Sequence, residues 1–152
     1  MKIIDIIDET NTANANIKSS SGSEYSRDEL YALAELIAQG GEVSSELVLR
    51  NLESSPLIVS AFVDGTAVGV VALKIPNASY KQKVFQNSNS QQLLNSFTLE
   101  VGYAYVEPSM RSQGVGIQVL RTMRTKMPAG VSATTRENNT TINAILKFAG
   151  FK

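Results

Sequence analysis

The segment from Leu57 to Leu73 constrains the fold of this chain more than any other part of the sequence. Two apolar runs, residues 57–63 and 67–73, flank Asp64-Gly65, a dipeptide that favours the two-residue turn of a β-hairpin. The second run is almost entirely apolar, so it has no polar face to present to water and we expect it to be buried on both faces. The rest of the chain must therefore cover both sides of a sheet.

Helical patterns lie on both sides of this hairpin in the sequence. Ser26 and Glu29 have the spacing of a capping box, and leucine and isoleucine recur at helical intervals as far as Gly40-Gly41. Further helices are expected from about Ser44 to Leu52, from Gly114 to Met127, and after a cap at Asn138 or Asn139; further strands are expected at residues 3–7, 99–106 and 131–135. This order predicts an α/β (α+β) domain with a mixed sheet.

Two polar stretches, near residues 10–24 and 76–97, are rich in Asn, Ser and Gln or Thr. They lack the apolar content of a packed element, so both are predicted to be loops. The sequence contains no internal repeat and no sign of a second domain. We therefore expect a single domain over residues 1–152.

Charge and composition exclude several classes of function. The chain has 14 basic and 14 acidic residues, which gives no electrostatic reason to expect nucleic acid or an anionic membrane as the main partner. No apolar stretch approaches membrane-spanning length, and Asp5 interrupts the only apolar run at the N-terminus, so we expect a cytoplasmic protein without a signal peptide.

The chain has no cysteine and no histidine. Disulfides, thiolate metal sites, a cysteine nucleophile and a Ser-His-Asp triad are therefore excluded, and we expect no bound metal. Any acid–base chemistry must use Asp, Glu, Lys, Tyr or water.

A glycine loop follows the expected strand at residues 99–106. Gly114 and Gly116 lie where the next helix begins, and the backbone N–H groups at a helix N-terminus suit a phosphate. A Walker A loop is excluded because no lysine follows the glycines, and the dinucleotide fingerprint fails because Val119 stands at its third glycine. A simple turn with a helix cap stays open as the alternative.

The motif that remains is Arg-x-x-Gly-x-Gly, formed by Arg111, Gly114 and Gly116, with Val-Glu-Pro before it at residues 106–108. Downstream, Asn139 is followed by Gly150-Phe151. Together these residues resemble the GNAT superfamily, the N-acetyltransferases that use acyl-CoA. The resemblance covers most of the chain outside the two polar loops and implies a GNAT-like, mainly antiparallel sheet flanked by helices.

The resemblance also implies the residues that bind acetyl-CoA. Arg111 and the backbone amides of Ser112, Gln113, Gly114, Val115 and Gly116 would hold the pyrophosphate. Ala104 and Val106 would pair with the pantetheine arm as an added strand does, and Asn139 would contact the co-substrate from the last helix. Two alternatives stay open, since Arg111 can equally be a solvated surface arginine and Asn139 a helix cap.

Glu100 is the predicted general base, at a spacing from the loop where some family members carry a catalytic glutamate. Strict alternation along a strand would put Glu100, Gly102, Ala104 and Val106 on one face, and Tyr103 and Tyr105 on the other. Glu107 is the weaker alternative base, and Glu100 can also lie on a solvent-exposed face. The tyrosine that often serves as general acid in the family is replaced here by Leu146.

The family usually adds two strands after Gly-Phe, and this chain ends there. We therefore expect a sheet that lacks these last two strands, with homodimerisation by edge pairing or an unusual closure of the edge. The predicted function is transfer of an acetyl group from acetyl-CoA to a primary amine of a small molecule or peptide, without a covalent enzyme intermediate. The alternative is a CoA-binding or interaction protein that has kept the fold without catalysis; a nucleic-acid modifier would need a basic face, which the neutral composition disfavours.

Overall fold

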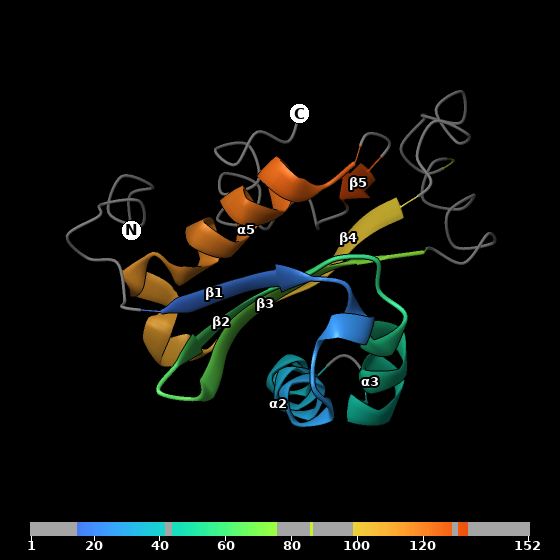
Figure 1. The fold of residues 1–152 in the computed structure, drawn as a ribbon. Coiled ribbons are helices and arrows are strands. Elements are labelled where there is room, and N and C mark those ends of the chain that lie inside the picture. The colour runs from blue at the N-terminus through green and yellow to red at the C-terminus, as the bar shows by residue number, and fades with distance from the viewer. Residues whose placement is uncertain (1–14, 42–43, 76–85, 87–98, 129–130, 134–152) are drawn as a thin grey trace.

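A five-stranded sheet forms the centre of the protein, with its strands side by side in sequence order (Figure 1). The computed structural model describes residues 15–41, 44–75, 86, 99–128 and 131–133. The strands are β1 (Asn16–Ser20), β2 (Ile58–Val63), β3 (Thr66–Lys74), β4 (Leu99–Val106) and β5 (Val131–Ala133). Neighbouring strands are antiparallel from β1 to β4, and β5 runs parallel to β4.

Helices cover both faces of this sheet (Figure 1). The short 3-10 helix η2 (Gly22–Glu24) leads into α2 (Arg27–Ala38), and α2 packs with α3 (Ser45–Glu53) on one face. A second 3-10 helix, η4 (Pro108–Gln113), leads into α5 (Val115–Lys126) on the other face. The predicted mixed sheet flanked by helices is therefore confirmed. None of the helices within the described residues is long and apolar enough to cross a membrane.

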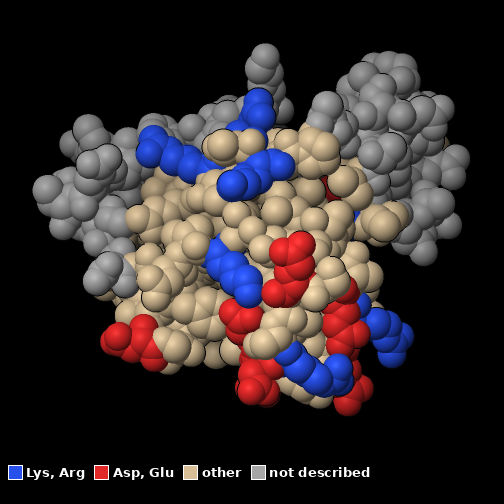
Figure 2. Space-filling model, in the orientation of Figure 1, with Lys and Arg blue, Asp and Glu red and all other residues tan. Residues whose placement is uncertain are grey.

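The two helical layers differ in charge. Acidic side chains gather over α2 and α3, in the lower part of Figure 2. The two helices carry five acidic and two basic residues, namely Asp28, Glu29, Glu35, Glu46 and Glu53 against Arg27 and Arg50. The neutral overall composition thus conceals a local acidic surface.

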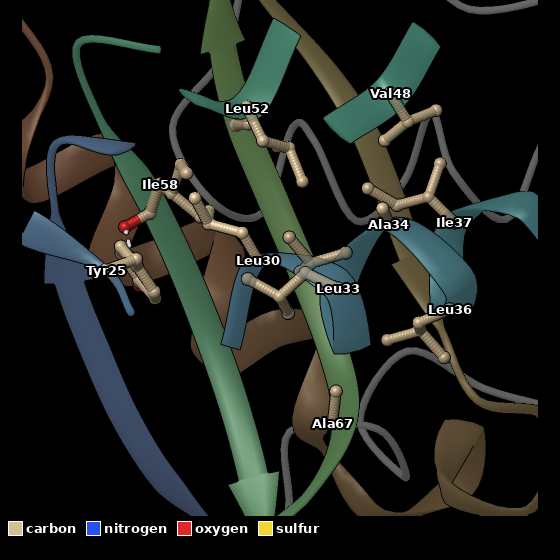
Figure 3. Close-up of a cluster of buried hydrophobic side chains, with 12 residues drawn as sticks. Tyr25, Leu30, Leu33, Ala34, Leu36, Ile37, Val48, Leu52, Ile58 and Ala67 are labelled. Atoms are coloured by element: carbon tan, nitrogen blue, oxygen red, sulfur yellow. Dashed lines mark hydrogen bonds between the residues drawn. The ribbon is translucent and has the colours of Figure 1, made fainter. Parts of the chain in front are cut away.

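Strand β3 is buried on both faces, as its composition predicts. Every residue from Ala67 to Leu73 is buried. Val71 and Leu73 pack with Val115, Val119 and Met123 of α5. Val70 and Ala72 pack on the opposite side in the cluster built from α2 and α3, which includes Leu33 and Leu52 (Figure 3).

The local signals for the hairpin and for α2 are also confirmed. Asp64 and Gly65 both have positive φ, 50° and 80°, as the predicted two-residue turn requires. Ser26 and Glu29 form the capping box in full, because each side chain accepts a hydrogen bond from the other residue's backbone N–H.

The prediction of a loop near residues 10–24 was wrong over its second half, where β1 and η2 lie. Strand β1 is an edge strand that pairs with β2 from Asn16 opposite Phe62 to Ser20 opposite Ile58. Its polar side chains are exposed or half-buried, so the strand has no hydrophobic alternation, and backbone pairing with β2 defines it instead. The expected strand at residues 3–7, the stretch 76–97 apart from residue 86, and the last helix lie outside the described residues.

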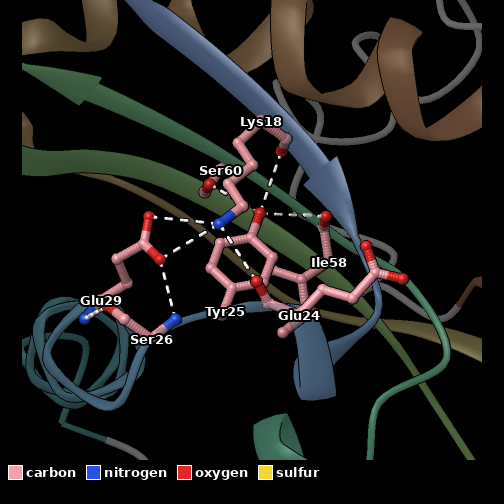
Figure 4. A network of polar contacts seen from close by, with 7 residues as sticks. All are labelled: Lys18, Glu24, Tyr25, Ser26, Glu29, Ile58 and Ser60. Carbon is pink, nitrogen blue, oxygen red and sulfur yellow. Dashed lines mark hydrogen bonds and ion pairs between the residues drawn. The ribbon is translucent and has the colours of Figure 1, made fainter.

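A polar network centred on Tyr25 joins the edge of the sheet to α2 (Figure 4). The Tyr25 hydroxyl shares a 2.8 Å hydrogen bond with Ser60 Oγ and lies 3.0 Å from the carbonyl oxygen of Lys18. Lys18 Nζ lies 4.2 Å from the centre of the Tyr25 ring and 3.1 Å from Glu29 Oε1. Because Tyr25 and Ser60 are both buried, these bonds satisfy groups that water cannot reach.

We predict that Tyr25→Phe lowers the free energy of unfolding by about 1–3 kcal/mol, since it removes a buried hydroxyl and its hydrogen bonds. Urea denaturation measures this change. Tyr31→Phe is the matched control, because Tyr31 is 47% exposed and its loss should stay within about 0.5 kcal/mol. Equal effects of the two substitutions would contradict the structural role of the network.

Burial also raises the pKa of Tyr25 to about 12. The hydrogen bond with Ser60 opposes this rise, and the negative charge of Glu29 adds to it to a smaller extent. The folded state therefore holds the phenol proton more tightly than the unfolded state. The tighter hold on this proton stabilises the fold fully at pH values below the pKa of Tyr25 in the unfolded chain. This stabilisation is lost as the pH rises through the pKa of Tyr25 in the folded protein. Between about pH 10 and 12 the wild type should lose more stability than Tyr25→Phe, as measured by urea denaturation over that range.

Candidate active site

Strand β4 contains a bulge opposite the middle of β3. Lys74, Leu73 and Ala72 pair with Glu100, Val101 and Gly102, and the pairing resumes with Val70 opposite Tyr105. Val71 thus faces both Tyr103 and Ala104, so β4 has one residue more than β3 over this stretch. Tyr103 has a positive φ of 52°, the backbone distortion that accommodates the extra residue.

The bulge changes which side chains share a face of the sheet. Before it, Val101 packs in the cluster with α5, so Glu100 lies on the opposite face, with α2 and α3. Beyond it, Tyr103 and Tyr105 pack against the α2–α3 cluster, while Val106 packs with α5. The prediction that Glu100 and Val106 share a face, with both tyrosines opposite, was therefore wrong, because strict alternation does not hold across an extra residue.

Glu100 is buried, with 6% of its surface exposed. The alternative of a solvated carboxylate on the outer face of the strand is therefore wrong. Its neighbour across the ladder is Lys74, the last residue of β3, so a basic side chain begins directly opposite the carboxylate. A carboxylate held at this position can serve as a general base if a substrate reaches it.

Asn51 and Lys74, which the sequence did not single out, join Glu100 on this face together with Tyr103. Asn51 Nδ2 of α3 donates a 2.5 Å hydrogen bond to the Tyr103 hydroxyl, and Lys74 Nζ lies 5.3 Å from the centre of the Tyr103 ring. Gly102 makes room for this arrangement, because a Cβ there would lie 2.9 Å from Lys74 Cε. An isolated glycine inside a strand pattern can indicate a bulge. Gly102 is therefore the sequence feature that could have predicted the bulge in β4.

The loop before α5 presents the start of a helix to the end of β4. Gly114 has φ 80° and is the N-cap of α5, and the first intrahelical bond runs from Gln118 N–H to the Gly114 carbonyl, 3.1 Å. The first amides of an α-helix have no partner within the helix, and a glycine N-cap has no side chain to cap them. This end of α5 therefore suits an anionic group.

Arg111 lies over the end of β4. Its Nε donates a 3.0 Å hydrogen bond to the Val106 carbonyl, and its guanidinium carbon lies 5.3 Å from the centre of the Tyr105 ring. The side chain is exposed, as a surface arginine is, and these two contacts hold it over the end of the strand. The structure thus brings Arg111 together with Val106, one of the two predicted pantetheine positions.

The remaining loop residues surround this helix start. Ser112 is exposed, and Gln113 Nε2 donates to the Ser109 carbonyl at 3.4 Å. Glu107 is engaged as the cap of η4, since its carboxylate accepts hydrogen bonds from the backbone N–H and the hydroxyl of Ser109. A structural role thus accounts for Glu107. Asn139 and Leu146 lie outside the described residues.

Close packing holds the start of α5 against the sheet. A Cβ on Gly69 of β3 would lie 2.7 Å from Val115 Cγ1, and a Cβ on Gly116 would lie 3.4 Å from Val106 Cγ2. The first turn of α5 therefore rests directly on β3 and beside the end of β4. Among the described residues, no group of three Asp and Glu side chains gathers in a way that could hold a metal ion.

Comparison with known proteins agrees with this architecture. The sequence model that describes the acetyltransferase (GNAT) family matches residues 18–151, and the chain therefore belongs to this family of acetyl-transferring enzymes. A search of curated proteins finds no significant match.

Several solved structures share the fold. A GNAT-family acetyltransferase from Streptococcus pneumoniae TIGR4 is similar with a TM-score of 0.61 at 19% identity, over 91% of this chain and 87% of that one. An aminoglycoside N-acetyltransferase in complex with CoA has a TM-score of 0.60 at 16% identity, over 92% and 90% of the two chains. An aminoglycoside acetyltransferase from an uncultured soil metagenomic sample, solved with sisomicin, has a TM-score of 0.59 at 11% identity, over 90% and 87%. At these identities the likeness concerns the fold.

We predict that Gly69→Ala destabilises the protein by about 1–3 kcal/mol, because the new methyl group overlaps the Val115 side chain. Adding Val115→Ala to this variant should restore part of the loss, since it vacates the space that the methyl group needs. Urea denaturation of the two single variants and the double variant measures their coupling. Strictly additive losses would contradict direct contact between β3 and the first turn of α5.

Proposed function

We propose that this chain transfers an acetyl group from acetyl-CoA to a primary amine by direct attack on the thioester. The observation that carries this proposal is the uncapped N-terminus of α5, which begins at Gly114 and lies beside the end of β4. An anion bound there lies next to a strand that leads to a buried carboxylate, Glu100. The family and the fold agree with this chemistry.

In this proposal the pyrophosphate binds to the backbone amides from Ser112 to Gly116. The pantetheine arm then follows the edge of β4 past Val106 and Ala104 towards Gly102. Four residues of strand cover about 13 Å, so the thioester comes to lie near the bulge. The Val106 carbonyl already accepts a hydrogen bond from Arg111, so pantetheine pairing at this residue requires Arg111 to share or leave the carbonyl. Arg111 is then close enough to contact the phosphates.

Glu100 is the proposed general base, either directly or through a water molecule. It takes a proton from the acceptor ammonium, and the neutral nitrogen attacks the thioester carbonyl. The carbon–sulfur bond breaks, the nitrogen releases its second proton to solvent, and the CoA thiolate takes up one proton. The bulge leaves one residue of β4 without its own partner in β3, and the amide of that residue is our candidate donor to the developing oxyanion.

The acidic surface over α2 and α3 supports an amine acceptor, which is positively charged before it reacts (Figure 2). Glu100 lies on this same side of the sheet, so the acceptor would approach from α2 and α3 while acetyl-CoA approaches from α5. Two structural neighbours are aminoglycoside acetyltransferases, and aminoglycosides are polycationic amines. We therefore propose a small cationic amine or a peptide amine as the acceptor class.

Acetyl-CoA should raise the thermal unfolding midpoint, because it binds the folded state. At a concentration about 100 times the dissociation constant, the gain of about 2.7 kcal/mol corresponds to a shift of about 5–10 °C for a domain of this size. Desulfo-CoA should give a similar shift, since it retains the pyrophosphate. No shift at concentrations well above micromolar would refute the co-substrate site.

Glu100→Gln should reduce acetyl transfer to an accepted amine about 100-fold or more and leave the acetyl-CoA thermal shift intact. The reaction is followed by release of free CoA thiol across a panel of polyamines, aminoglycosides and peptides. Glu24→Gln is the matched control, since Glu24 is exposed on η2 and should retain full turnover. A chain that binds acetyl-CoA but transfers it to none of these amines would instead be a CoA-binding protein that has kept the fold without catalysis.

A further inference from the structure

Lys74 extends from β3 across the predicted reaction site. It pairs with Glu100 in the ladder, so the two side chains leave the sheet on the same face from directly opposite positions, where Cβ atoms are about 5 Å apart. Its stem then runs along Gly102, because a Cβ on that glycine would lie 3.5, 3.1 and 2.9 Å from Lys74 Cγ, Cδ and Cε in turn. The lysine therefore points along β4 towards the bulge.

The end of the Lys74 side chain lies at the bulge itself. Its Nζ is 5.3 Å from the centre of the Tyr103 ring, within the range of a cation–π interaction. The Tyr103 ring is in turn fixed from α3 by the 2.5 Å hydrogen bond from Asn51 to its hydroxyl. An amine nitrogen of the chain thus lies on the same face of the sheet as the predicted base and beside the Tyr103 ring, at the bulge where the thioester is expected.

We propose that Lys74 is a site of self-acetylation, and that its Nζ accepts the acetyl group when no external amine occupies the site. This inference rests on the proposed acetyl-CoA chemistry. Glu100 would take one proton from the Lys74 ammonium, and the neutral nitrogen would attack the thioester carbonyl. The carbon–sulfur bond breaks as the carbon–nitrogen bond forms. The nitrogen loses its second proton and the CoA thiolate gains one, so that acetyl-lysine, CoA thiol and one proton result.

Position distinguishes Lys74 from the other lysines in the described part of the chain. Lys18 lies on the edge strand β1 and forms an ion pair with Glu29, and Lys126 is the last residue of α5. Neither faces β4. Acetylation of Lys74 would remove the positive charge opposite Glu100 and lengthen the side chain over Tyr103, so it would change the site that an external acceptor enters.

The test is incubation of the purified full chain with acetyl-CoA in the absence of an amine, followed by peptide mass spectrometry over time. We expect one acetyl group to accumulate at Lys74 with a first-order rate that does not depend on protein concentration, as a reaction within one molecule requires. Glu100→Gln should slow this rate about 100-fold. Gly102→Ala should slow it roughly 10-fold or more, because the new methyl group displaces the flexible lysine stem while the chain still folds.

Two variants serve as controls for this experiment. Lys126→Arg should leave acetylation of Lys74 unchanged, and Lys74→Arg should abolish the fast first-order phase. An unmodified Lys74 in a protein that acetylates an external amine would overturn this inference and leave the proposed function standing. An unmodified Lys74 in a protein that shows no thermal shift with acetyl-CoA would overturn both. Acetylation spread over many lysines, at a rate unaffected by Glu100→Gln, would show uncatalysed chemistry and also refute the proposal.

Discussion

The burial of β3 on both faces is the constraint from which the rest of the structure follows. A strand without a polar face needs an apolar layer above and below it, and α5 on one side and α2 with α3 on the other supply those layers. The two layers have different tasks. The first turn of α5 comes close enough to β3 at Gly69 to fix the N-terminal end of the helix, while α2 and α3 bring acidic groups and Asn51 to the opposite face.

Much of this architecture could be predicted from the sequence, because its signals are local. The Asp64-Gly65 turn, the Ser26 capping box and the bounds of β4 depend on residues close together in the chain, and the structure agrees with each of them. Strand β1 could not be predicted in this way. Its polar residues carry no periodic pattern, and its identity as a strand comes from pairing with β2, some forty residues away in the sequence.

The candidate site also contains residues of both kinds: some are found from local sequence signals, and others are brought together only by pairing and packing between distant segments. The loop from Arg111 to Gly116 is encoded locally, by a strand, two glycines and a helix start, so the sequence located it. The face on which Glu100 lies depends instead on the register between β3 and β4, and one extra residue at Tyr103 and Ala104 reversed the order that simple alternation predicts. The sequence did not identify Lys74 and Asn51 for the same reason. Only the strand register brings Lys74 to β4, and only the packing of α3 brings Asn51 there.

The bond from Arg111 to the Val106 carbonyl has a further consequence for the behaviour of the chain in solution. Within the described residues, β5 pairs with β4 only from Leu99 to Val101, so no described strand pairs with the outer edge of β4 beyond this point. An unpaired strand edge is in general a place where a strand from another molecule can add itself. A charged side chain over a carbonyl and a bulge in mid-strand are two devices by which proteins discourage such addition. The Arg111 side chain that would have to yield to a pantetheine arm would therefore also hinder pairing with a strand of another molecule.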